Sequence, residues 1–256
     1  KLKDNPFSFY GLPASFAIKK LFCLDLLFLP LWKRFFFWLE MTTFTQAAFI
    51  YAVLCIKKFN IIYTRDLVLA VWMSYIGPTV YEIHNLPERP GFFYRIAWRR
   101  ARKLVVISDG LRQDLVKFGA DSGKIILARD AVDMKKFDIS ISQEEARNKL
   151  KINLTEKIAL YTGHLFPWKG ADLLAEAAIS LPEIQIYFVG GSKEDLEKFR
   201  EKYKAKNNHI IGYRPADEIP LWLKAADVLV LPNRGKEKIS AKYTSPLKLF
   251  EYMASG

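Results

Sequence analysis

The chain has 256 residues, of which 51% are hydrophobic, so it is long enough for one large domain or two smaller ones with extensive apolar cores. Lysine and arginine outnumber aspartate and glutamate by 39 to 27, and the net charge of +12 favours anionic partners such as a nucleotide, a nucleic acid or a membrane surface. The basic residues are spread along the chain without an RNA- or DNA-binding motif. Nucleic-acid binding is therefore the least favoured of these functions.

Two cysteines occur, Cys23 and Cys55, each within an apolar run. We expect them to be small buried hydrophobic residues in a reducing compartment, because this pattern fits neither a disulfide framework nor a metal site. The first residues lack the pattern of a signal peptide. The apolar runs 21–31 and 44–56 are shorter than the roughly 20 residues that span a bilayer, which predicts buried helices.

Residues 1–57 predict helical or irregular structure without a clear strand. Within them, the segment 31–38 mixes aromatic and cationic side chains (Leu-Trp-Lys-Arg-Phe-Phe-Phe-Trp). Packing in the core is the favoured interpretation. Contact with an anionic membrane is the alternative, because aromatic and basic residues gather at membrane interfaces.

From residue 58 onward, strand and helix patterns alternate. The first run predicts strands at 58–65, 79–84, 103–108 and 124–128 and helices at 66–76, 92–102 and 109–118. The segment 129–141 breaks this rhythm, and a helix with a capping box formed by Ser142 and Glu145 follows it. We place a domain boundary near Phe137.

A second alternating run follows. It predicts strands at 157–163, 184–190, 209–213 and 227–232 and helices at 171–181, 192–206, 216–226 and 246–255. Two such runs predict an α/β fold with two doubly wound, Rossmann-type domains that face each other across a cleft, 1–137 and 138–256. No first strand leads into a glycine-rich turn, and no strand follows Gly256, so we expect a fragment in which both domains are incomplete.

The last stretch, 243–256, predicts a helix with Ser245 or Thr244 as its cap and Pro246 at the first helical position. Its expected apolar stripe consists of Leu247, Phe250 and Ala254. An uncovered helix N-terminus binds anions, and Glu251 lies about 9 Å further along the helix than Ser245. A nucleoside diphosphate could lie there with its ribose at the carboxylate. A solvated glutamate on an ordinary amphipathic helix is the alternative.

A second candidate is the loop Tyr-Thr-Gly-His-Leu-Phe-Pro-Trp-Lys-Gly at 161–170, between a strand and a helix. Gly163 and Gly170 permit close approach of the backbone, and Lys169 stands where a cation can hold phosphate oxygens. A surface lysine in a turn is the alternative. Both loops follow strands of one predicted sheet, and ligands of such sheets lie outside the carboxyl ends of the strands. We therefore expect Lys169 and Glu251 to share a site.

Gly-His-Leu-Phe-Pro-Trp-Lys-Gly at 163–170 and Tyr-Thr-Ser-Pro-Leu-Lys-Leu-Phe-Glu-Tyr-Met-Ala-Ser-Gly at 243–256 resemble the family-4 retaining glycosyltransferases of the GT-B fold. The stretches 105–111 and 131–137 fit the same family. The resemblance implies a cytoplasmic enzyme of hexosyltransferase type for polysaccharide biosynthesis, which could associate with the inner face of the cell membrane. Its donor would be a nucleotide-diphospho-sugar and its acceptor a glycan or a lipid-linked glycan. The reaction would retain the anomeric configuration and need no metal or other cofactor.

By this resemblance, Lys169 would bind the diphosphate, Glu251 the ribose and His84 the transferred sugar, and these three are the expected catalytic residues. The expected donor-binding residues are Gly163, His164, Lys169, Gly190, Tyr213, Arg214, Ser245, Leu247, Lys248 and Glu251. The expected acceptor-side residues are Arg65, Glu82 and His84.

The sequence departs from the family at Tyr243, where a glutamate is usual, at His164, where an arginine is usual, and at 130–131, where Asp-Ala replaces Asn-Gly. Lys248 could supply part of the missing positive charge. A non-catalytic module that binds a nucleotide or an anionic surface stays open as the second function class, and a nucleotide-sugar 2-epimerase is a less well matched enzyme. A fragment of this kind could also lack activity by itself.

Overall fold

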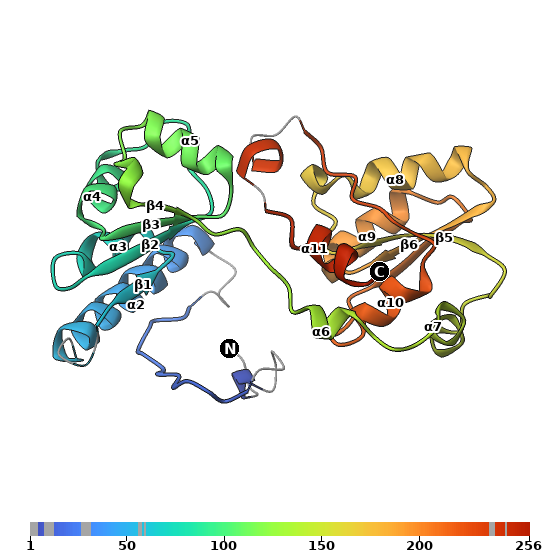
Figure 1. The fold of residues 1–256 in the computed structure, drawn as a ribbon, viewed down its shortest axis with the longest axis horizontal. Helices are drawn as coiled ribbons and strands as arrows, with labels where there is room; N and C mark the ends of the chain where they lie inside the picture. Colours follow the sequence, from blue (N-terminus) through green and yellow to red (C-terminus); the bar gives the residue numbers. More distant parts are fainter. Residues whose placement is uncertain are drawn as a thin grey trace. The chain divides into compact units, whose positions relative to one another are not determined.

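The structure, a computed structural model, describes residues 5–7, 13–26, 32–55, 58, 60–235, 239–243 and 245–256. These residues form two β-sheets with helices packed around them (Figure 1). Two compact units can be distinguished, 1–81 with 91–102 and 82–90 with 103–256. The strands of the first sheet end at Leu127 and those of the second begin at Lys157, while the domain boundary near Phe137 stays a prediction. Thr244, the alternative helix cap, lies outside the described residues.

The first sheet has the strand order β1-β2-β3-β4, with β1 parallel to β2 and β3 parallel to β4. Its strands are β1 Ile62–Thr64, β2 Thr79–Ile83, β3 Lys103–Val106 and β4 Ile125–Leu127. The helices of this part are α2 Lys33–Cys55, α3 Leu67–Met73, α4 Phe92–Arg100 and α5 Asp109–Lys117. Each strand and helix predicted for the first alternating run is confirmed, with shorter bounds than predicted.

The apolar N-terminal runs are less buried than predicted. Among the described side chains of α2, only Thr45 and Ala52 are buried, and Leu54 is 79% exposed. The helix packs on α3, where the rings of Phe49 and Trp72 lie 5.5 Å apart, but part of its apolar surface faces solvent. Cys23 and Cys55 are free thiols and only partly buried. Among the described helices, none combines the length and hydropathy needed to cross a bilayer.

The second sheet has the order β7-β6-β5-β8, and its paired strands are parallel. Its strands are β5 Lys157–Thr162, β6 Ile184–Val189, β7 Asn208–Gly212 and β8 Val228–Leu229. Its helices are α6 Met134–Phe137, α7 Gln143–Leu150, α8 Ala171–Ala177, α9 Lys193–Lys202, α10 Ile219–Ala225 and α11 Leu247–Ala254. The chain moves outward from β5 to β7 and then places β8 on the other side of β5. This reversal is the predicted doubly wound arrangement, in which ligands typically bind in a crevice outside the carboxyl ends of the strands at the reversal, here β5 and β8.

Helices cover both faces of the second sheet. In β5, Ile158 and Leu160 face the layer that contains α7, α10 and α11, whereas Ala159 and Tyr161 face the layer that contains α8 and α9. This alternation follows from the two-residue period of a strand. Because the central strands are buried on both faces, they read as continuous apolar runs in the sequence.

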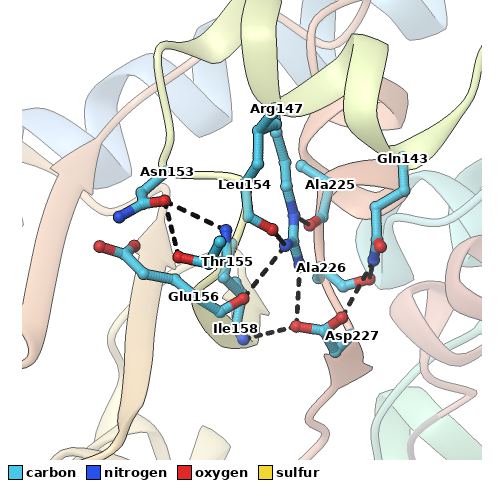
Figure 2. A network of polar contacts seen from close by, with 10 residues as sticks. All are labelled: Gln143, Arg147, Asn153, Leu154, Thr155, Glu156, Ile158, Ala225, Ala226 and Asp227. Carbon is cyan, nitrogen blue, oxygen red and sulfur yellow. Dashed lines mark hydrogen bonds and ion pairs between the residues drawn. The ribbon is translucent and has the colours of Figure 1, made fainter.

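A buried arginine ties α7 to the starts of β5 and β8 (Figure 2). Arg147 is 4% exposed and lies 2.8 Å from Asp227 Oδ2. Its guanidinium also donates to the carbonyls of Leu154, Glu156 and Ala225, at 2.7, 3.1 and 2.9 Å. Asp227 in turn accepts from the backbone N–H of Ile158 at 2.7 Å. This network closes the end of the sheet opposite to the crevice, so we assign it to stability. The predicted capping box at the start of α7 is present.

The start of α11 differs from the prediction. Pro246 is the N-cap, with an extended backbone (φ −75°, ψ 104°), and the first helical residue is Leu247. Ser245 does not cap the helix, because its hydroxyl accepts from the backbone N–H of Asp130 at 3.0 Å. The predicted apolar stripe is also wrong in part: Ala254 is buried, but Leu247 is 47% exposed.

Candidate functional site

The candidate site lies where the strand order reverses, in the loops that follow β5 and β8. These two loops are in contact, because Arg234 N–H donates to Trp168 C=O at 3.1 Å. Gly170 makes a still closer approach: a Cβ atom at this position would lie 1.9 Å from the carbonyl oxygen of Pro232, and its φ is +72°. Glycine is required there by both space and conformation. Lys169, directly before it, ends a 3₁₀ turn and is fixed by this contact.

Lys248 of α11 reaches the same place from the other side. Its ammonium Nζ lies 3.8 Å from the ring centroid of Tyr161, at the end of β5. A Cβ atom on Gly163 would lie 2.5 Å from Cε and 2.9 Å from Nζ of Lys248. The absence of a side chain at Gly163 therefore makes room for this lysine. Its Nζ is buried and has no hydrogen-bond partner in the described residues.

Lys169, Lys248 and Glu251 form a cluster of three interacting charges. Burial and, to a smaller extent, the neighbouring Lys169 lower the pKa of Lys248 to about 7, against the opposing effect of Glu251. Burial also lowers the pKa of Lys169, against the attraction of Glu251. Burial raises the pKa of Glu251, and the two lysines counteract this shift. Each of the three side chains interacts electrostatically with the other two, as the expected shared site requires, while their roles in binding stay predictions.

This arrangement can bind an anion with several negative oxygens. The two lysines can supply positive charge. Among the described residues no side chain caps the start of α11, and although Leu249 N–H donates to Pro246 C=O, the positive end of this helix favours an anion. Glu251 adds a carboxylate that can accept hydrogen bonds from hydroxyl groups. A cluster of this composition suits a diphosphate that is joined to a sugar. Among the described residues, no group of three or more His, Cys, Asp or Glu side chains could hold a metal ion.

Aromatic side chains surround Lys169. Its Nζ lies 5.7 Å from the ring centroid of Phe166 and 5.2 Å from that of Trp168. His164 stacks on Phe166 with centroids 5.1 Å apart, and its carbonyl accepts from the Tyr161 hydroxyl at 2.6 Å. Sequence reasoning missed Tyr161, Phe166 and Trp168 as site residues. The aromatic residues on either side of Gly163 were the sequence signal that could have indicated them. Which of these rings lies beneath Lys248 is decided by the position of α11, which the sequence does not show.

The remaining donor-side residues lie along the carboxyl edge of the second sheet. Gly190 follows β6, and its N–H donates to Gly212 C=O at 2.7 Å. Tyr213 follows β7 and is 68% exposed. Arg214 lies 3.7 Å from Glu218. Because β6 separates β7 from β5, Tyr213 and Arg214 stand further from the reversal than Gly163 does.

The residues expected on the acceptor side lie on the first sheet or directly after its strands. Arg65 directly follows β1, Glu82 is the fourth residue of β2, and His84 directly follows β2. His84 Nε2 contacts Glu82 Oε1. Arg65 and His84, which directly follow strands, therefore occupy positions from which residues of α/β sheets typically contact ligands.

Tyr243, at the position where a glutamate was expected, has a different role in this structure. It ends a helical turn, Ile239–Tyr243, is 2% exposed, and donates its hydroxyl to Asp114 of α5 at 2.6 Å. The neighbouring Lys242 carbonyl accepts from Ser108 at 2.7 Å. Gly110 permits this approach, because a Cβ atom there would lie 2.3 Å from the same carbonyl oxygen.

Comparison with known proteins finds a family model that is similar to the segment carrying this cluster. Residues 142–256 match the family model of the glycosyl transferases, group 1. The matched residues include Lys169, Lys248 and Glu251, so the charge cluster lies within the segment that is similar to this family. The putative colanic acid biosynthesis glycosyl transferase WcaI of Escherichia coli (strain K12) is 25% identical over 171 residues, which cover 64% of this chain and 41% of WcaI.

Solved structures show the fold. Sucrose-phosphate synthase from Thermosynechococcus elongatus aligns with a TM-score of 0.71 and 20% identity, over 93% of this chain and 63% of the other. HepE of Anabaena in complex with UDP and glucose aligns with a TM-score of 0.61 and 19% identity, over 81% and 60%. The α/β, GT-B-like fold expected from the sequence is confirmed. The chain spans less than half of WcaI and less than two thirds of these two structures.

Proposed function

We propose that this protein transfers a sugar from a nucleotide-diphospho-sugar to a glycan or a lipid-linked acceptor, as a family-4 enzyme of hexosyltransferase type. We further propose that the anomeric configuration is retained and that no metal is required. The observation that carries the proposal is the cluster of Lys169, Lys248 and Glu251 at the reversal of strand order, within a segment that matches group 1 glycosyl transferases. HepE, a structural neighbour, was solved with UDP and glucose, which makes UDP the first nucleotide to test.

The cluster suits the charge that develops in such a reaction. As the bond between the sugar and the diphosphate breaks, negative charge grows on the leaving phosphate and the sugar becomes cation-like. Lys169, Lys248 and the N–H groups at the start of α11 would stabilise the leaving group, since fixed donors in a partly buried site act electrostatically without reorganising. Glu251 would hold the ribose hydroxyls. His84 would bind a hydroxyl of the transferred sugar once the two domains close on it.

Turnover of nucleotide sugars tests the proposal. We expect Lys169→Ala to lower the rate of sugar transfer or donor hydrolysis by at least 100-fold, a loss typical of removing one electrostatic donor. Lys198→Ala is the matched control, because this lysine is 72% exposed and pairs with Glu194 on α9. Equal rates for wild type and Lys169→Ala would refute the assignment of the site. The anomeric configuration of the product tests retention, and unchanged turnover in EDTA tests metal independence.

We propose that the protein acts in polysaccharide assembly in the cytoplasm, at the inner face of the cell membrane. Trp32, Phe35 and Trp38 are 75%, 57% and 64% exposed, and Arg34 is exposed beside them. Such a mixture suits a membrane interface. We expect binding to anionic vesicles that weakens with salt and is reduced in Trp32→Ser/Trp38→Ser. If the protein sedimented equally with anionic and uncharged vesicles, the proposed electrostatic contribution to membrane binding would be contradicted.

A non-catalytic module that binds a nucleotide or an anionic surface is the second candidate. It is favoured by Tyr243, whose hydroxyl is engaged by Asp114, and by His164 at the position of a family arginine. Nucleotide binding without transfer or hydrolysis of any nucleotide sugar would select this function over the enzyme.

A further inference from the structure

We propose that, above neutral pH, Lys248 is uncharged in the empty site and takes up a proton when a nucleoside diphosphate binds, so that nucleotide binding and protonation of this side chain are linked. This coupling rests on the donor site proposed above and adds a property that the proposed reaction does not itself require. The proton is transferred from hydronium or the acid form of the buffer to the lone pair of the amine Nζ: an N–H bond forms, the donor's bond to that hydrogen breaks, and the donor keeps the electron pair.

The geometry of Lys248 favours the neutral amine while the site is empty. Its Nζ is buried and has no hydrogen-bond partner in the described residues. A buried ammonium without an acceptor is costly, because it loses its hydration and gains no partner in exchange. Gly163 leaves room for Lys248 because it has no side chain. For the same reason, Gly163 offers Lys248 no side-chain acceptor.

The groups that face Lys248 act in opposite directions. Lys169, from the 3₁₀ turn after β5, is a like charge that disfavours the ammonium, whereas Glu251, from α11 itself, favours it. The Tyr161 ring of β5 also favours a cation over its face. Glu251 is divided between two lysines and is itself made less acidic by burial. Burial and Lys169 prevail, in agreement with the lowered pKa of about 7 for Lys248.

A bound diphosphate reverses this balance. It places acceptor oxygens and negative charge beside Nζ, which stabilises the ammonium and returns the pKa of Lys248 toward its ordinary range. At a pH below about 7 the lysine is already charged, so nucleotide binding takes up few protons. Above this pH, each binding event must also capture a proton. Affinity therefore falls as the pH rises through and beyond 7.

Isothermal titration calorimetry with UDP, ADP and GDP tests the coupling. At pH 8.0, in two buffers with different heats of ionisation, we expect uptake of about 0.9 proton per bound nucleotide. Between pH 7.0 and 9.0, we expect the Kd to rise by roughly 50-fold. The terminal phosphate does not confound this range, because its second pKa is about 6.

Two variants assign the proton to Lys248. Lys248→Met should bind the nucleotide more weakly but without proton uptake, and Lys248→Arg, with a permanent charge, should bind with a Kd that is flat between pH 7.0 and 9.0. Lys198→Met should behave as wild type. Thermal unfolding establishes that each variant is folded. Uptake that persists in Lys248→Met, or wild-type binding without uptake, would overturn the coupling and leave the donor site standing. Absence of binding by all three nucleotides at pH 6.0 to 9.0 would refute the donor site as well.

Discussion

Replacing Lys248 by methionine should make the empty protein more stable. The pKa of Lys248 falls from the ordinary 10.5 to about 7 because burial and Lys169 disfavour its charge. A shift of this size corresponds to a cost of about 4 kcal/mol to the folded state at pH 7, at about 1.4 kcal/mol per pKa unit. Methionine has a similar length, no charge to desolvate, and a sulfur that packs well on the Tyr161 ring.

Urea unfolding at pH 7 measures the effect. Part of the cost is relieved when the site relaxes, so we expect Lys248→Met to raise the free energy of unfolding by about 2–4 kcal/mol. The difference from wild type should shrink as the pH rises from 7 to 10.5, because the folded pKa is depressed and the unfolded lysine loses its proton over that range. Lys198→Met, at an exposed site, should change stability by less than about 0.5 kcal/mol. A Lys248→Met protein that is equally or less stable at pH 7 would refute the idea that this lysine is strained.

Three further predictions concern the frame of the second sheet. Arg147→Met should lower the free energy of unfolding by about 2–4 kcal/mol in urea, because buried carbonyls lose their donor; a loss below 1 kcal/mol would contradict this. Burial works against ionisation of Asp227, but its hydrogen bonds with Ile158 and Arg147 prevail and lower its pKa below 3.8. Its contribution to the free energy of unfolding is therefore complete above pH 3.8 and is lost as the pH falls below that value. Asp227→Asn should therefore make the stability depend less on pH in the acid range. Acid unfolding followed by circular dichroism measures this, and an unchanged midpoint pH would contradict the role of the Asp227 carboxylate. Gly170→Ala should reduce both stability and nucleotide affinity, since its Cβ would meet Pro232 C=O; unchanged thermal stabilisation by UDP would argue against that contact.

Local signals in the sequence predicted most of the elements. The alternation of apolar and polar stretches located the strands and helices of both sheets, and Ser142 marked a helix start that the structure confirms. These signals are local, because a cap bonds within its own first turn and a strand exposes alternate residues to opposite faces. The same reasoning selected Lys169 and Glu251 as neighbours, from the rule that strands of one parallel sheet end at one edge.

Tertiary contacts decided the details of the site. Ser245 had the right sequence position to cap α11, but a backbone N–H 115 residues away, at Asp130, uses its hydroxyl, and the helix begins later. Tyr243 is likewise buried by its bond to Asp114 of α5. Sequence alone specified a lysine at 248; only the fold placed it over Tyr161 and beside Lys169, without an acceptor. Charge type is a property of the residue, but burial and neighbours, which set the pKa, exist only once distant segments have packed together.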